Sequence, residues 1–187
     1  LVFASGSLAY GNSEVAHFED SPLSPISYSK QYIAGEKPLL KAINIENYPV
    51  LLLRFPWLIG NGSWFKWFYH ESAKEAGKIP IFGDGDNHMS IINVTDAARL
   101  MVEYPKRYNE SGVYNIFSPS CLKQKEFLEL IAKSYGCEIV DFKQLYPGGL
   151  EKAVIEAFES NIIMDSKYME LLENYGFKSI AESIDHF

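Results

Sequence analysis

Two serines near the start of the sequence lie where a buried strand would present hydroxyl groups to a loop. The apolar run Leu1–Ala4 is followed by Ser5 and Ser7, and then by the turn-like tripeptide Tyr10–Asn12. In α/β proteins, the carboxyl end of such a strand is where reactive groups gather, because the loops there open onto a crevice. The spacing makes Ser5 and Ser7 candidates for hydrogen-bonding a reacting oxygen.

A second candidate is Tyr28, at the start of Ser27–Asn47, a segment whose pattern predicts a helix. A tyrosine can pass a proton to or from a substrate hydroxyl, but a phenol with a pKa of ~10 needs a nearby cation to act as a general base at neutral pH. One helical turn on stands Tyr32 rather than a lysine, and Lys30 points to roughly the opposite face. Tyr28 is therefore either a weakened acid/base group or an aromatic residue that packs on the loop before the helix.

Apolar runs separated by helical segments must position these residues. Tyr48–Phe55 and Gly112–Ser118 are continuous apolar runs, typical of parallel strands that are buried on both faces. Strands that alternate with helices predict an α/β fold with right-handed crossovers. The strands expected to be parallel neighbours in one sheet are Val2–Ala4, Val50–Arg54 and Val113–Phe117.

Two of the predicted helices carry specific expectations. Within Ser27–Asn47, Pro38 cannot donate a hydrogen bond to the carbonyl of Ala34, so we expect a kink or break near that position. Thr95–Tyr104 has the periodicity of a helix that packs on the sheet. The residues expected to face inward from it are Ala97, Ala98, Met101 and Val102.

The composition excludes several classes of protein. The chain has 187 residues and a formal net charge of −7 at pH 7, which argues against a general nucleic-acid or anionic-membrane surface. No apolar run approaches the ~20 residues of a membrane-spanning helix. Cys121 and Cys137 are the only cysteines, and they suit inert thiols in a reducing compartment. The sequence has no CxxC or HxxxH spacing, which argues against a zinc site. We therefore expect a cytoplasmic protein with a small-molecule substrate, and no nucleic-acid, membrane or metal partner.

Six segments, taken in order, resemble the C-terminal part of the NAD-dependent epimerase/dehydratase family, the extended short-chain dehydrogenase/reductases. They are FASGSLAYG, EDSPLSPISY, LLLRFPWLIGNG, IFGDGDNHMSIINVTDAARLM, GVYNIFSPSCLKQKEFLELIAKSYG and MDSKYMELLENYGF. The family's glycine-rich nucleotide-binding turn lies on its first strand, whereas the resemblance begins at about the fifth. Either roughly 100 residues precede this sequence, or the protein has lost its dinucleotide-binding half.

The resemblance places Tyr28 at the family's active-site tyrosine. It puts Tyr32 at the position of the lysine that lowers the pKa of that phenol, and Gly6 at the position of the serine. Ser5 and Ser7, on either side of Gly6, are the remaining hydroxyl candidates. The acid/base machinery is thus eroded, as in atypical members of the superfamily.

The resemblance also implies binding residues. The phosphate-binding arginine of nucleotide-sugar enzymes would fall at Met89, which cannot pair with a pyrophosphate. The aromatic segment Trp64–Tyr69 is either core packing or a wall for an apolar, ring-shaped ligand. The implied cofactor-binding residues are Tyr28, Tyr32, Phe55, Pro56 and Trp57, and the implied substrate-binding residues are Trp64, Trp67, His88 and Met89.

Two charged residues of the matched segments are assigned structural roles. Arg54, at the end of the second apolar run, is expected to anchor the strand end. Asp96 is expected to satisfy backbone donors at a helix start rather than to act as a catalytic acid.

Two functions remain open at this point. The first is an NAD(P)-dependent epimerase/dehydratase-like oxidoreductase acting on a hydroxyl-bearing, sugar-type substrate, with a homodimer allowed. The second is a catalytically degenerate dinucleotide-binding sensor or regulatory module. Residues 1–59 and 93–118 would be the remaining part of an NAD(P)-binding Rossmann-like domain. Residues 60–92 and 119–187 would form a small α/β substrate-binding lobe, and NAD or NADP would bind only with the upstream part present.

The isolated 187-residue chain should not bind NADH or NADPH with useful affinity. The reason is that the resemblance places the phosphate cradle and adenine pocket on upstream strands. Titration of the isolated chain with each nucleotide, followed by fluorescence or calorimetry, measures this. Micromolar binding would mean that the chain builds a cofactor site of another kind.

Overall fold

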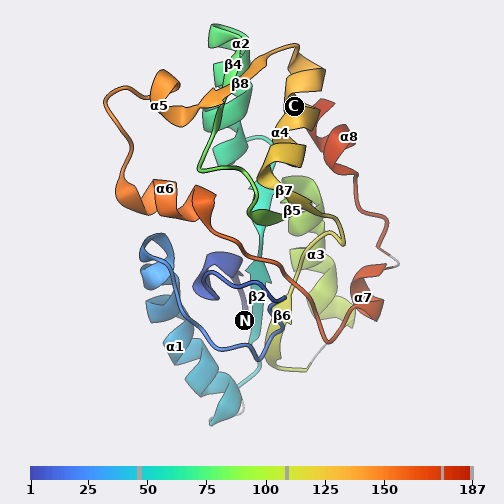
Figure 1. Ribbon diagram of the computed structural model, residues 1–187. Coiled ribbons are helices and arrows are strands. Elements are labelled where there is room, and N and C mark those ends of the chain that lie inside the picture. The colour runs from blue at the N-terminus through green and yellow to red at the C-terminus, as the bar shows by residue number, and fades with distance from the viewer. Residues whose placement is uncertain (46–47, 108–109, 174, 186–187) are drawn as a thin grey trace.

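A three-stranded parallel sheet lies at the centre of the part that holds the N-terminus, with α1 and α3 on either side of it (Figure 1). The computed structural model describes residues 1–45, 48–107, 110–173 and 175–185. The sheet has the strand order β1-β2-β6, and both pairings are parallel. Its strands are β1 (Val2–Gly6), β2 (Leu51–Phe55) and β6 (Gly112–Asn115).

The register of this sheet confirms the predicted α/β arrangement. Val2 pairs with Leu51, and Leu51 pairs in turn with Gly112. All five residues of β2 are buried, as expected for a strand covered on both faces. β1 lies at the edge of the described sheet and is only partly buried.

Two smaller sheets contain the remaining strands of the described residues. One has the order β3-β5-β7, with β3 parallel and β7 antiparallel to β5, and the other is the parallel pair β4-β8. The strands are β3 (Trp57–Ile59), β4 (Lys78–Ile81), β5 (His88–Asn93), β7 (Cys121–Lys123) and β8 (Glu138–Asp141).

Short helical segments connect these strands. Among the described residues, no helix is both long and apolar enough to cross a membrane. The helical elements are η1 (Ser7–Ala9), η2 (Ser27–Ser29), α1 (Lys30–Asn44), η3 (Lys66–His70), α2 (Glu71–Ala76), α3 (Val94–Arg107), α4 (Gln124–Tyr135), α5 (Phe142–Leu145), α6 (Lys152–Glu159), α7 (Glu170–Glu173) and α8 (Ile180–Asp185).

The expected break at Pro38 is wrong. α1 continues through this proline from Lys30 to Asn44, after the short turn η2. Pro38 and Ala34 are both exposed, so water can solvate the Ala34 carbonyl that the proline leaves unpaired. Burial of the opposite face then holds the helix together.

The inward face of α3 also differs from the expectation. Ala97 is buried and Met101 is half-buried, but Ala98 and Val102 are exposed. The buried positions are Ala97, Leu100 and Tyr104, which follow the i, i+3, i+7 spacing. The buried face of α3 is centred on Leu100 and Tyr104, because these larger side chains bury more apolar area than Ala98 and Val102 would.

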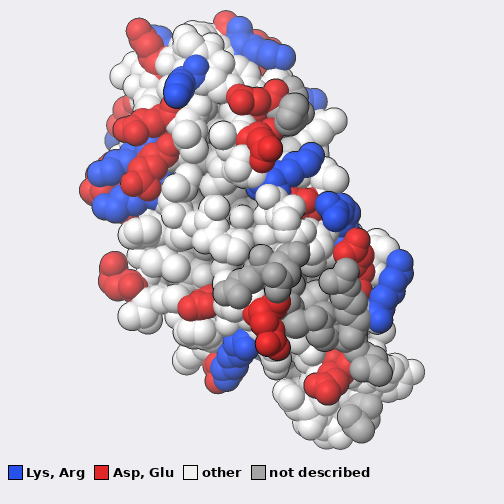
Figure 2. All heavy atoms as spheres, turned by 90° about the vertical axis from the view of Figure 1, so that its right-hand side faces the viewer, with Lys and Arg blue, Asp and Glu red and all other residues white. Residues whose placement is uncertain are grey.

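Two large apolar clusters form most of the core among the described residues, and a third, smaller cluster is formed by Leu8, Ile26, Ala157 and Ile162. One core is built around β2 and α3, and includes Leu53, Leu100 and Ile116. The other is aromatic and lies between η3, β4 and α4, with Phe65, Phe82 and Phe127 fully buried. On the face shown in Figure 2, acidic and basic side chains are interspersed over the surface.

A buried ion pair ties α1 to the end of β2. Arg54 is 2% exposed and Glu36 is fully buried, and their side chains pair in bidentate fashion. Arg54 Nη2 lies 2.6 Å from Glu36 Oε2, and Arg54 Nε lies 3.1 Å from Glu36 Oε1. Ser5 at the end of β1 donates to the same carboxylate at 2.5 Å. Arg54 therefore anchors the strand end, as the sequence suggests.

The same network continues across the sheet. Arg54 Nη1 donates to the Tyr10 hydroxyl at 2.9 Å, and Tyr10 donates to Asn115 Oδ1 at 2.6 Å. Burial raises the pKa of Tyr10 in spite of the opposing effect of Arg54. Asn115 Nδ2 donates to the carbonyls of His17 and Asp165. These bonds join β6 to the loop that holds His17 and to the segment between α6 and α7.

Asp96 has a structural role different in detail from the expected one. Its Oδ2 accepts from the backbone N–H of Lys178, a residue of a distant segment, at 2.9 Å. The start of α3 is instead capped by Asn93, whose side chain accepts from the N–H of Thr95 at 2.8 Å. Both side chains are buried, so these bonds hold β5, α3 and the C-terminal segment together.

Replacing Glu36 with Gln should lower the free energy of unfolding by about 3–5 kcal/mol, because it leaves the buried Arg54 guanidinium without its counter-charge. Urea unfolding followed by circular dichroism measures the change. Glu129→Gln, an exposed position on α4, is the matched control and should shift stability by no more than about 0.5 kcal/mol. Equal, small shifts for both variants would contradict the role given to the ion pair.

Candidate functional site

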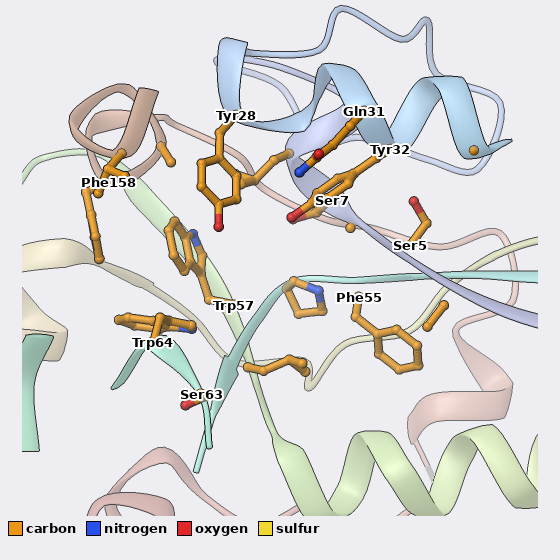
Figure 3. A pocket seen from close by; sticks show the side chains of 18 of the residues that line it. Ser5, Ser7, Tyr28, Gln31, Tyr32, Phe55, Trp57, Ser63, Trp64 and Phe158 are labelled. Carbon is orange, nitrogen blue, oxygen red and sulfur yellow. The ribbon is translucent and has the colours of Figure 1, made fainter. Parts of the chain in front are cut away.

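A cavity of about 600 Å³ opens at the carboxyl ends of β1 and β2 (Figure 3). Its walls come from the β1–η1 segment, the start of α1, the link from β2 to β3, the start of η3, and α6. A crevice at the carboxyl ends of parallel strands is the usual ligand site of an open α/β sheet. Its polar lining residues are Ser5, Ser7, Tyr28, Gln31, Tyr32 and Ser63.

The turn η2 carries Tyr28 to the mouth of this cavity. Ser29 Oγ donates to the carbonyl of Leu8 at 2.6 Å, which holds η2 against η1. On the other side, the backbone N–H of Ser27 donates to Glu156 Oε2 at 3.1 Å, which holds the turn against α6. Tyr28 is 44% exposed, and its phenol points into the cavity toward Trp57 (Figure 3).

Tyr32 lies next to Tyr28 and lines the same cavity. The two rings are arranged edge to face with centroids 6.4 Å apart. Burial raises the pKa of the Tyr32 phenol, and the neighbouring Tyr28 adds to this rise. Tyr32 is therefore a neutral hydrogen-bonding group at neutral pH and does not supply the positive charge of a lysine.

Gly6 and Tyr32 fit each other closely. A Cβ atom at Gly6 would lie 2.9 Å from Tyr32 Cε2, although the backbone of Gly6 is in the ordinary extended region. A serine at position 6 would therefore require the ring of Tyr32 to move. The absence of a side chain at position 6 and the presence of a tyrosine at position 32 are therefore coupled.

The two serines beside Gly6 are not equivalent. Ser5 uses its hydroxyl on Glu36, within the buried network. Ser7 is buried at the cavity wall, and its hydroxyl makes no hydrogen bond within the part of the chain that the structure describes. Ser7 is thus the serine that remains available to a ligand.

Aromatic side chains form the wall opposite Tyr28. Trp57 meets Trp64 edge to face at 4.7 Å and stacks on Phe158 at 5.1 Å. Phe68 packs against Phe158 at 4.7 Å. The turn before η3 depends on Gly60, whose φ of +140° suits glycine and whose Cβ would meet Val94 at 2.4 Å. These contacts make Trp64 and Phe68 both core residues and cavity wall.

The structure brings eight of the residues proposed from the sequence to this cavity and leaves three elsewhere. Trp67 is 58% exposed and lies under the ammonium group of Lys66. His88 bonds Asn161 through its backbone and its ring. Met89 is fully buried in the aromatic core and is not among the residues that line this cavity. The residues that line the cavity are Ser5, Ser7, Tyr28, Tyr32, Phe55, Pro56, Trp57 and Trp64.

Helix α6 contributes cavity residues that sequence reasoning missed. Val154, Ala157 and Phe158 line the cavity from this helix, more than 120 residues away from Tyr28. Their i, i+3, i+4 spacing indicates an apolar helix face, but nothing in the spacing tells which surface that face covers. Gln31, one turn before Gly35 on α1, was also missed.

The cysteines are free and lie outside the cavity. Cys121 is exposed and Cys137 is half-buried, and burial of the thiol raises the pKa of both. Among the residues that the structure describes, no three His, Cys, Asp or Glu side chains are arranged to hold a metal ion.

The sequence and fold together define the family. The model of the NAD dependent epimerase/dehydratase family matches residues 1–117, more than half of the chain. The chain belongs to this family. It is also 24% identical over 157 residues to Protein YeeZ of Escherichia coli K12, a match that covers 82% of this chain and 53% of that protein.

Solved structures share the fold over the whole chain. dTDP-glucose 4,6-dehydratase from Bacillus anthracis, in complex with NAD, aligns with a TM-score of 0.77 at 21% identity, over 100% of this chain and 59% of that one. UDP-glucuronic acid 4-epimerase from Bacillus cereus, in complex with UDP-glucuronic acid and NAD, aligns with a TM-score of 0.74 at 18% identity, over 98% and 58%. The chain thus spans little more than half the length of the proteins that it matches.

Proposed function

We propose that this chain is the catalytic and substrate-binding part of an NAD(P)-dependent oxidoreductase that interconverts a hydroxyl and a carbonyl group. Tyr28 is the proton-transfer residue, and Ser7 hydrogen-bonds the reacting oxygen. The observation that carries the proposal is the position of the Tyr28 phenol at the mouth of a cavity formed by the carboxyl ends of β1 and β2. Family membership supports the cofactor class.

The floor of the cavity fits the nicotinamide end of such a cofactor. Phe55 and Pro56 are buried and line the cavity where β2 ends, giving a flat apolar surface for a planar ring. A bound reduced nicotinamide would supply a hydride. We assign residues 1–59 and 93–118 to the cofactor side, and residues 60–92 and 119–187 to the substrate side.

The groups around Tyr28 favour reduction of a carbonyl over oxidation of an alcohol. No lysine or arginine lines the cavity within the part of the chain that the structure describes, so we assign the Tyr28 hydroxyl the role of proton donor to the oxygen that gains negative charge. The reverse reaction needs the phenolate, which the missing lysine would have stabilised. Tyr28 would therefore act as a general acid, while Ser7 holds the same oxygen.

A catalytically degenerate sensor is the second candidate. It is favoured by one observation, which is that the ring of Tyr32 lies against Gly6. The resemblance puts these two residues at the positions of the family's lysine and serine. Such a protein would bind the cofactor and a ligand without turnover.

In the full-length protein, Tyr28→Phe should lower kcat for carbonyl reduction by about 100-fold or more, because general acid catalysis contributes at least that much. The affinity for the cofactor should change little. Oxidation of NADH and NADPH, followed by absorbance with a panel of aldehydes and ketones, gives the rate, and calorimetry gives the affinity.

Tyr48→Phe, an exposed tyrosine outside the cavity, is the matched control and should keep the wild-type rate. Equal rates for the Tyr28 and Tyr48 variants would contradict the role of Tyr28. Cofactor binding with no turnover of any substrate by the wild type would favour the sensor.

A further inference from the structure

The cavity is lined without any charged side chain. None of its lining residues is Asp, Glu, Lys, Arg or His within the part of the chain that the structure describes. The nearby carboxylate of Glu36 is paired with the guanidinium of Arg54 and accepts a hydrogen bond from the hydroxyl of Ser5, and Glu36 and Arg54 are themselves not among the lining residues. The polar groups left to a ligand are neutral.

A charged ligand would lose its water in this cavity and gain no counter-charge. Burial of an unpaired ionised group costs several kcal/mol, whereas hydroxyl or carbonyl groups need only a hydrogen bond. Arg and Lys side chains, which commonly hold a pyrophosphate, do not line the cavity within the part of the chain that the structure describes. Here the charged group that contacts the Tyr28 turn is a carboxylate, Glu156, which bonds the N–H of Ser27.

The shape of the cavity favours a flat ring. Trp57, Trp64, Phe68 and Phe158 form one wall of mutually packed aromatic rings, and Tyr28 faces Trp57 from the other side (Figure 3). Aromatic faces and edges bind planar apolar groups through large contact areas and ring–ring contacts. A volume of about 600 Å³ lies within the usual range for sites that enclose a small organic ligand.

We propose that this cavity takes an uncharged, ring-bearing carbonyl or hydroxyl compound, rather than a nucleotide-linked sugar. The ring lies against the wall of Trp57, Trp64 and Phe158. Its oxygen is held at Tyr28 and Ser7, and the amide of Gln31 serves a second polar group. This inference rests on the proposed function for the role of Tyr28, but the neutrality of the cavity stands apart from turnover.

The test compares ligands that differ in charge on one ring system. Binding of 2-naphthol, 2-naphthoate and UDP-glucose to the full-length protein is measured by calorimetry at pH 7, with and without NADH. We expect 2-naphthol to bind about tenfold or more tightly than 2-naphthoate, because only the second ligand buries a charge. UDP-glucose should not displace it.

A charge placed in the cavity should change this preference. Gln31 is exposed at the mouth, so Gln31→Lys adds an ammonium group with little risk to folding, and it should raise the affinity for 2-naphthoate relative to 2-naphthol by about tenfold. Ala34→Lys, on the same helix but outside the cavity, is the matched control and should leave the ratio unchanged.

Tighter binding of UDP-glucose than of 2-naphthol would overturn the proposal, as would equal binding of the two naphthalene compounds or no binding of 2-naphthol. NADH oxidation is followed separately. Selective binding of the neutral ring without any turnover would contradict the proposed oxidoreductase and leave this inference standing.

Discussion

The bidentate pair of Arg54 and Glu36 is the interaction on which the site depends. It fastens α1 to the end of β2, and through Ser5 it fastens the same helix to the end of β1. Two strand ends and one helix are thereby fixed relative to one another at the floor of the cavity. The position of Tyr28, two residues before α1 begins, follows from this anchoring and from the bond between Ser29 and Leu8.

The same pair explains why the cavity is neutral. The guanidinium of Arg54, near the end of β2, donates its hydrogen bonds to Glu36 and Tyr10. Its positive charge is therefore directed toward these residues and not toward the ligand space. Desolvation acts to lower the pKa of Arg54, but its bonds to Glu36 and Tyr10 outweigh this and raise it, so it stays charged. The charged groups near the cavity thus belong to the framework, and the described lining of the ligand space consists of aromatic, aliphatic, hydroxyl and amide groups.

The sequence predicts those parts of the fold whose signal is local. The short apolar runs around Leu53 and Tyr114 form strands of the parallel sheet, where a strand between two neighbours is covered on both faces. Local signals fail where a distant segment decides the outcome. Pro38 is tolerated within α1 because this side of the helix is left exposed to water. Met89 is buried because segments distant in sequence pack around β5.

The candidate site shows the same division. Ser7 and Trp57 lie just after the ends of β1 and β2, and Tyr28 lies just before α1. The predicted strand ends and helix start therefore indicate that these residues lie at the cavity. The contribution of α6 depends on the path of the chain after β8, and no pattern within Lys152–Glu159 encodes that path. The fit of Tyr32 on Gly6 is a contact across 26 positions, and it becomes visible only when the ring and the backbone are seen together.

We infer from the family resemblance that a neutral phenol, Tyr32, stands at the position of the family's lysine. The most direct test is the pKa of Tyr32, measured by NMR of tyrosine labelled at the ring carbon that bears the hydroxyl, and assigned with the Tyr32→Phe variant. Burial and the neighbouring Tyr28 predict a pKa above the ordinary phenol value of about 10. A pKa clearly below that value would reveal a cation beside the ring and would contradict the account.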